Sequence, residues 1–152
     1  MPTPLGQGFR GTGGRVGYLL RQASHAFRTA MEQALRAQGL TAAQYSMLSI
    51  VQSQPGLSGA ELAEDAMLAA QSANEVIISL ERAGLIERRR DDRDGRIRRV
   101  YLTPDGQTAT DRARRCVYAL EARMIAPLTE RQIRAFKTAL VDCAVALQDG
   151  TA

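Results

Sequence analysis

Apolar residues recur at three- and four-residue intervals in four stretches of the chain, which is the period of an amphipathic helix. These stretches cover residues 15–38, 41–51, 104–124 and 129–148. Gly39 is placed to end the first, and Pro127 separates the last two. The pattern therefore predicts long helices at both ends of the chain.

Helix beginnings are marked by motifs in which Ser or Thr is followed three residues later by Glu or Gln. Each side chain can then bond the backbone N–H of the other residue. The motifs are Thr41–Gln44, Ser58–Glu61, Ser72–Glu75 and Thr129–Gln132. The second and third open two short helices, the latter ending at Gly84, with only a few residues between them. Residues 58–84 are therefore predicted to form a helix-turn-helix.

After Gly84 the apolar residues change from the helical period to partial alternation with charged side chains, which is typical of strands. Two such runs flank the turn-forming sequence DDRDG, so a hairpin is predicted over residues 85–103. Within Arg88–Val100 lie seven arginines and three aspartates. Thr103 then caps a helix that has Pro104 at its first position. A helix-turn-helix followed by a charged hairpin is the pattern of a winged helix.

The predicted fold is mainly α with a small β-hairpin (α+β), a winged helix-turn-helix with additional helices at its N- and C-terminal ends. Residues 15–148 are expected to form a single domain, with the winged-helix lobe at 41–103. Residues 1–14 contain five glycines and two prolines and are expected to be a flexible arm. The arm contains a GxGxxG sequence, but no strand precedes it, so a dinucleotide site is not expected.

Composition limits the classes of function. A chain of 152 residues with 45% hydrophobic and 24% charged residues is long enough for one soluble domain. Its 20 basic and 16 acidic residues allow an anionic partner. Two cysteines are too few for a disulfide framework, and there is no signal peptide or membrane span, so a cytoplasmic protein without a membrane partner is expected. No metal cluster, nucleophile motif or phosphate loop is found, so neither an enzyme nor a cofactor is expected.

Four sequence segments resemble MarR-family transcriptional regulators. They are LTAAQ at 40–44, GAELAE at 59–64, SLERAGLIERRRD at 79–91 and DRDGRIRRVYLTPDG at 92–106. The family's wing reads roughly D-P-R-D-x-R and then V-x-L-T-x-x-G. The matching residues are Asp91, Arg93, Asp94, Arg96, Val100, Leu102, Thr103 and Gly106. The resemblance covers residues 15–148.

The resemblance implies a ligand-responsive DNA-binding regulator, usually a repressor. It would be a homodimer held by helices at 15–38 and 104–148, and it would bind a pseudo-palindromic double-stranded DNA operator. The recognition helix would enter the major groove and a wing arginine the minor groove. A small aromatic or lipophilic acid is the effector that the family implies. A winged helix that binds protein or RNA remains the alternative from another class.

Eight residues are expected to contact DNA or orient the contacts. They are Gln71, Ser72, Asn74 and Ser79 in the recognition helix and Arg93, Asp94, Arg96 and Arg98 in the wing. By resemblance, Asp94 orients the wing and Arg96 enters the minor groove. The arginines at 88–90 are expected to face phosphate or solvent.

Two positions depart from the family pattern. Gly95 stands where relatives often have arginine, and Glu75 stands where they often carry a cation. Glu75 is expected to complete a capping box with Ser72, although a carboxylate could also accept a hydrogen bond from cytosine N4.

The resemblance also implies a ligand pocket, which Tyr18, Arg21, His25 and Tyr45 could line. For His25, the only histidine, a merely structural role is the favoured interpretation. Some family members sense oxidants through cysteine, but those that do typically use one in the first helix, which has none here. Cys143, on an apolar stripe, is interpreted as a small core residue, and redox sensing through Cys116 or Cys143 stays an alternative.

Overall fold

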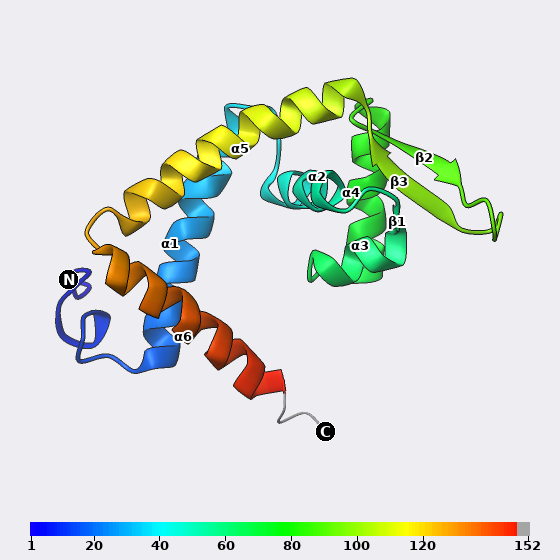
Figure 1. Cartoon of the computed structure of the whole chain (residues 1–152). Coiled ribbons are helices and arrows are strands. Elements are labelled where there is room, and N and C mark those ends of the chain that lie inside the picture. Colours follow the sequence, from blue (N-terminus) through cyan, green and yellow to red (C-terminus); the bar gives the residue numbers. More distant parts are fainter. Residues whose placement is uncertain (149–152) are drawn as a thin grey trace. The chain divides into compact units, whose positions relative to one another are not determined.

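The computed structural model describes residues 1–148 and contains six α-helices, a short 3-10 helix and three strands (Figure 1). In chain order they are η1 (Gly8–Arg10), α1 (Val16–Arg36), α2 (Ala42–Ser53), β1 (Leu57–Ser58), α3 (Gly59–Asp65), α4 (Ala70–Arg82), β2 (Ile86–Arg90), β3 (Arg98–Leu102), α5 (Pro104–Ile125) and α6 (Glu130–Gln148). The chain divides into two compact units, one of residues 1–118 and another that begins at Ala119. The predicted mainly α winged helix-turn-helix is confirmed.

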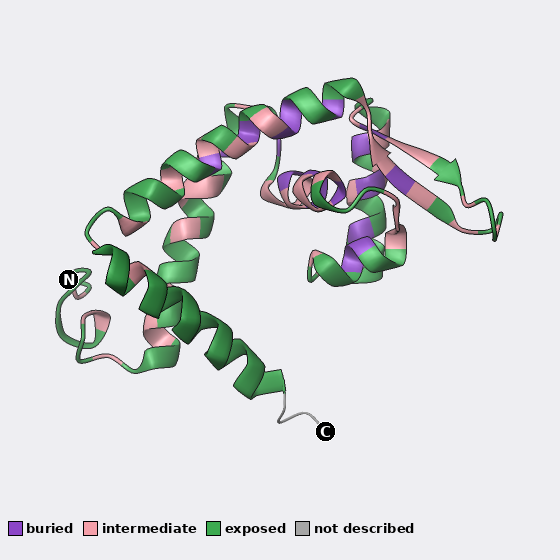
Figure 2. Ribbon diagram, in the orientation of Figure 1, coloured by how far each residue is buried: buried purple, intermediate pink, exposed green. Residues whose placement is uncertain are grey.

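The core of the first unit is built from α2, α3, α4 and the sheet, together with the second half of α1 and the part of α5 up to Val117 (Figure 2). Its largest fully buried side chains are Leu35, Met47, Leu48, Val51, Leu62, Leu80, Val100 and Thr110. These are the apolar positions of the helical and strand periods, apart from Thr110, whose hydroxyl donates to the Gly106 carbonyl at 2.7 Å. The core holds α3 and α4 as a helix-turn-helix and seats the sheet beside them.

The sheet is antiparallel with strand order β1-β3-β2. In the hairpin, Arg88 lies opposite Val100 and Arg90 opposite Arg98. The predicted hairpin is confirmed, but the third strand was missed. The missed strand is β1, in which Leu57 pairs with Val100 of β3. Its two residues are too few to show alternation.

Three of the four predicted capping boxes are present. Thr41 and Ser58 each exchange hydrogen bonds with the residue three positions later, and so does Thr129 with Gln132. The prediction for Ser72–Glu75 is wrong. Helix α4 begins two residues earlier, at Ala70, and its N-cap, Ala69, forms no side-chain hydrogen bond.

The early start of α4 has a local cause. Met67 adopts the left-handed conformation (φ 54°) and ends α3, and the partly buried Leu68 packs on the core, so the chain turns back at once. The backbone N–H of Ala73 already bonds the Ala69 carbonyl at 2.9 Å. Ser72 and Glu75 therefore both lie inside the helix, with exposed side chains.

The segment before Arg15 differs from the unattached arm that its composition predicted. It contains η1, and Arg10 binds α1: the Arg10 Nε donates to Gln22 Oε1 at 3.2 Å, and the Gln22 amide donates to the Arg10 carbonyl at 3.2 Å. Polar contacts hold these residues beside the helix, and hydrophobic periodicity does not predict contacts of this kind.

The second unit contains the end of α5 and all of α6. No residue of α6, as far as Gln148, is buried, although the helix carries apolar side chains. Its exposed large apolar residues are Phe136, Leu140, Val141, Val145 and Leu147. Cys143 is exposed as well, so its interpretation as a core residue is wrong. Within residues 1–148 no helix combines the length and the hydropathy needed to cross a bilayer.

Candidate nucleic-acid interface

Helix α4 turns one face to the core and the opposite face to solvent. Ala73, Ile77 and Leu80 are buried at 3% exposure or less. The four predicted base-contact residues, Gln71, Ser72, Asn74 and Ser79, are all exposed. The helix is therefore free to present polar side chains to a partner along its outer face.

The four residues are not equivalent. At 3.6 residues per turn, Gln71 lies in a stripe with Glu75, Ile78 and Arg82, opposite the buried face. Ser72 and Ser79 lie at one edge of this stripe, and the Ser79 hydroxyl accepts a hydrogen bond from the Gln44 amide at 2.8 Å.

Ile78 and Arg82 are therefore candidate contact residues that the sequence interpretation missed. Their three- and four-residue spacing from Gln71 and Glu75 could have found them.

The wing tip is organised by Asp91. Its Oδ1 accepts from the backbone N–H groups of Arg93 (2.8 Å) and Asp94 (2.9 Å), and its Oδ2 accepts from Arg99 Nε at 2.7 Å. These hydrogen bonds lower the pKa of Asp91 to about 2, those from the Asp94 N–H and the Arg99 side chain being the largest causes. The charged carboxylate therefore fixes the start of the tip.

Arg99 extends this arrangement to the helix-turn-helix. Its Nη1 lies 3.1 Å from Glu61 Oε2, and the same oxygen accepts the Ser58 N–H in the capping box that starts α3. Another contact joins Nη1 to the Gly56 carbonyl at 3.4 Å. With a side chain only 28% exposed, Arg99 serves as a brace between wing and α3 and not as a contact for DNA.

The predicted wing residues occupy the tip and its flank. Arg96 is the most exposed: its side chain is 94% accessible, and its Nε lies 3.4 Å from Asp94 Oδ1. Asp94 Oδ1 also accepts the Arg96 backbone N–H at 3.0 Å. Arg93 and Arg98 are exposed, without an ion pair to any described residue. The structure thus brings Arg93, Asp94 and Arg96 together, with Asp94 directing the Arg96 guanidinium.

Two arginines of β2 do not simply face phosphate or solvent as expected. Arg88 forms a two-pronged ion pair with Glu81 of α4, with an Nη2–Oε2 distance of 2.5 Å, and this hydrogen bond lowers the pKa of Glu81. Arg89 pairs with Glu87 and lies over the Tyr101 ring at 4.5 Å. Arg88 thereby fastens the wing to the recognition helix, while Arg90 remains exposed.

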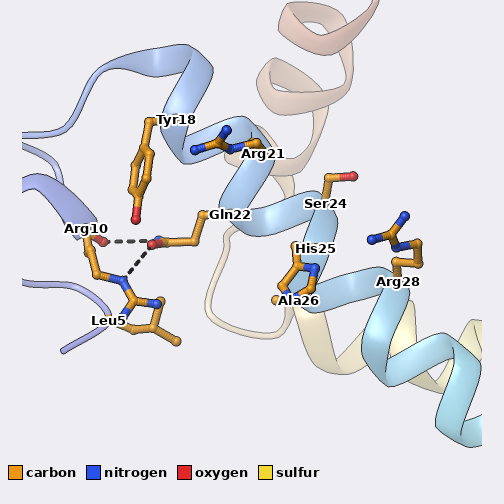
Figure 3. A pocket seen from close by; sticks show the side chains of 9 residues that line it. All are labelled: Leu5, Arg10, Tyr18, Arg21, Gln22, Ser24, His25, Ala26 and Arg28. Carbon is orange, nitrogen blue, oxygen red and sulfur yellow. Dashed lines mark hydrogen bonds between the residues drawn. The ribbon is translucent and has the colours of Figure 1, made fainter. Parts of the chain in front are cut away.

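A second candidate site is a pocket between the N-terminal segment and α1 (Figure 3). It is lined by Leu5, Arg10, Tyr18, Arg21, Gln22, Ser24, His25, Ala26 and Arg28. Three predicted pocket residues, Tyr18, Arg21 and His25, are among them, and the Arg21 guanidinium lies 5.6 Å from the Tyr18 ring centre. Tyr45 is not, because it is buried in the core. Arg10 was missed because it lies in the segment expected to be a free arm.

Residues 38–97, from the start of the lobe to the wing, match the family model described as MarR family. The chain is also 38% identical over 125 residues to the HTH-type transcriptional repressor Rv2887 of Mycobacterium tuberculosis, covering 82% of this chain and 90% of that protein. The chain belongs to the MarR family. Its relatives are transcriptional regulators.

Solved structures of MarR proteins have the same fold. The Mycobacterium tuberculosis MarR family protein Rv2887 in complex with DNA superposes with a TM-score of 0.71 at 35% identity, over 85% of this chain and 97% of that one. The complex of that protein with p-aminosalicylic acid gives a TM-score of 0.70 at 35% identity, over 86% and 98%. Among residues 1–148, no group of three or more His, Cys, Asp or Glu side chains is arranged to hold a metal ion.

Proposed function

We propose that this MarR protein is a ligand-responsive repressor that binds a pseudo-palindromic operator as a homodimer. The observation that carries the proposal is the wing tip, where Asp94 directs an Arg96 side chain that is 94% exposed. A directed guanidinium is suited to a narrow, negative minor groove. Beside it, the outer face of α4 offers Gln71, Asn74 and Arg82 to base edges in the major groove.

The homodimer is supported by exposed apolar surface. All five large apolar residues of α6 named above are exposed in the single chain. Apolar surface of this extent is typical of an interface between protein chains. In a two-fold dimer the recognition helices would enter successive major grooves about one duplex turn apart.

The repressor proposal is tested by selecting genomic fragments that the purified protein retains, followed by gel-shift titration at fixed salt. We expect enrichment of an inverted repeat and, by light scattering, twice the monomer mass at micromolar concentration. A protein that retains single-stranded RNA and no duplex would favour the alternative RNA-binding module, and a monomer at this concentration would contradict the dimer.

The effector is proposed to be a small aromatic acid bound in the α1 pocket. Three cations, Arg10, Arg21 and Arg28, line it together with Tyr18 and His25, which suits a carboxylate attached to a ring. The relative crystallised with p-aminosalicylic acid supplies a probe of that class.

Titration calorimetry with p-aminosalicylate tests the pocket. Arg21→Ala should weaken binding about tenfold, since a hydrogen bond between charged groups contributes about 1.5–3 kcal/mol. Arg36→Ala, on the same helix but outside the pocket, should bind as the wild type does. Equal affinity in the wild type and Arg21→Ala would place the ligand elsewhere.

A further inference from the structure

We infer that Glu75 is a specificity-determining residue that selects cytosine at one position of each operator half-site. The inference rests on the proposed function, because it supposes that α4 enters the major groove. Helix α4 is described completely and carries two carboxylates. Glu81 is bonded to Arg88, whereas Glu75 is exposed and forms neither a hydrogen bond nor an ion pair with a described residue.

Glu75 is aimed away from the protein. It lies two residues from both Ala73 and Ile77, which puts it about 200° around the helix from each of these buried side chains. Gln71, one turn before it, and Arg82, two turns after it, share its stripe. Glu75 also lies in the second turn of α4, within the N-terminal part of a recognition helix that contacts base edges.

The role as a helix cap that the sequence favoured for Glu75 is excluded by the start of α4 at Ala70. A carboxylate with no internal partner is thus presented to solvent on the outermost stripe of the helix. With α4 in the major groove, as proposed, this stripe faces the DNA, where a negative charge is repelled by phosphates of any sequence.

Only one base offers this carboxylate a hydrogen bond without a competing acceptor. Guanine presents N7 and O6 and thymine presents O4, all acceptors that repel a carboxylate in the major groove. Adenine presents its N6 donor beside the N7 acceptor, and that acceptor repels a carboxylate. Cytosine presents the N4 donor alone, so Glu75 would be stabilised at cytosine and repelled elsewhere.

Glu75 would favour operators with cytosine in two ways, by its attraction to cytosine and by its repulsion from other DNA. The repulsion lowers the affinity for every sequence, and a cytosine in the right place offsets it. The cost is tolerable because the exposed wing arginines Arg93 and Arg98 supply attraction that does not depend on sequence. Removing the charge of Glu75 should therefore strengthen binding to unrelated DNA and weaken the preference for cytosine.

The experiment is selection from randomised duplexes with the full-length wild type and Glu75→Gln, followed by titration of the best site and of unrelated DNA. The wild type should prefer cytosine at one position per half-site by about tenfold. Glu75→Gln should lose that preference or transfer it to adenine, whose N6 and N7 suit an amide, and should bind unrelated DNA about threefold more tightly.

Glu64→Gln is the matched control. Glu64 is an exposed carboxylate of α3, so this variant loses the same charge from the same lobe. It should retain the cytosine preference. Equal melting temperatures of the three proteins would confirm that folding is unaffected.

The two failures are distinguishable. If the wild type and Glu75→Gln enrich the same bases at every position, the inference about Glu75 is overturned while DNA binding stands. If the wild type enriches no duplex at all, the proposed function fails and the inference fails with it.

Discussion

The wing and the recognition helix face the same proposed partner with opposite chemistry. The wing carries seven arginines between residues 88 and 99, and four of them, Arg88, Arg89, Arg96 and Arg99, are paired with acidic side chains of the same chain. Helix α4 offers one exposed arginine, Arg82, and an exposed carboxylate. The two regions are therefore suited to different roles in binding. Arginine contacts to the backbone and minor groove supply affinity, whereas polar contacts to base edges supply sequence specificity.

The largest effect is expected from a substitution that displaces the base of the wing. A Cβ added to Gly106 would lie 1.8 Å from the carbonyl oxygen of Leu85, the residue before β2. Gly106→Ala should therefore lower the free energy of unfolding by about 3 kcal/mol, even though alanine is the better helix former. Thermal melting measures this. The control is Gly95→Ala, whose Cβ would meet no atom within 4 Å.

The next largest effect is expected at the wing tip. Arg96→Ala should weaken operator binding by at least about 1 kcal/mol, the range of a specific groove contact. Gel-shift titration at one salt concentration measures the loss. Arg89→Ala is the matched control, because that guanidinium is engaged by Glu87 and by the Tyr101 ring. Equal losses in the two variants would show that only the charge of the wing matters.

The internal bracing of the wing gives a pH dependence. The folded-state pKa of Asp91 is about 2, below its ordinary value of 3.8, so its stabilising contribution is complete above about pH 4 and is lost as the pH falls towards 2. Asp91→Asn should melt at a lower temperature than the wild type at pH 7, and the gap should narrow between pH 4 and 2. Asp92→Asn controls for the loss of one wing carboxylate. A gap that stays constant with pH would contradict the role of the Asp91 charge.

A smaller effect is expected from adding a positive charge to the wing tip. Gly95 has open space around its Cα and does not need a left-handed backbone. Gly95→Arg should therefore fold normally and bind all duplexes about threefold more tightly, with a salt dependence steeper by about 0.9 per added phosphate contact. Titration of specific and unrelated DNA at several salt concentrations measures both. A gain confined to the specific site would mean that residue 95 reads sequence.

No effect is expected from replacing the two cysteines, which lie outside the wing and the recognition helix. Cys116 is half-buried in α5 and Cys143 exposed in α6, and both are free thiols. Cys116→Ser and Cys143→Ser should leave the response of DNA binding to peroxide unaltered. A response present in the wild type and lost in either variant would revive the redox alternative.

The sequence predicted the wing better than it predicted the recognition helix. Strand alternation, the turn residues and the Thr103 cap all lie within a few residues of one another, so local chemistry sufficed to place the hairpin. At α4 the same reasoning failed, because Ser72 and Glu75 have the spacing of a capping box but the chain had already turned at Met67. The prediction of Tyr45 as a pocket residue failed for a similar reason. Core packing, and not its position in the sequence, decides where the Tyr45 side chain lies.

Interactions between near neighbours set the order of the six helices and the hairpin, and the starts of the helices capped by Thr41, Ser58, Thr103 and Thr129. Periodicity, caps and turns are such interactions, so these features could be predicted from the sequence, as could the family. The division of the charges in "RRRDDRDGRIRRV" into paired and exposed ones depends instead on tertiary contacts, which the sequence does not reveal. Arg88 reaches Glu81, and Arg99 reaches Glu61 thirty-eight residues away. These pairings depend on core packing that sets α3 and α4 beside the sheet, and they leave Arg96 and Glu75 exposed as the charges proposed to contact DNA.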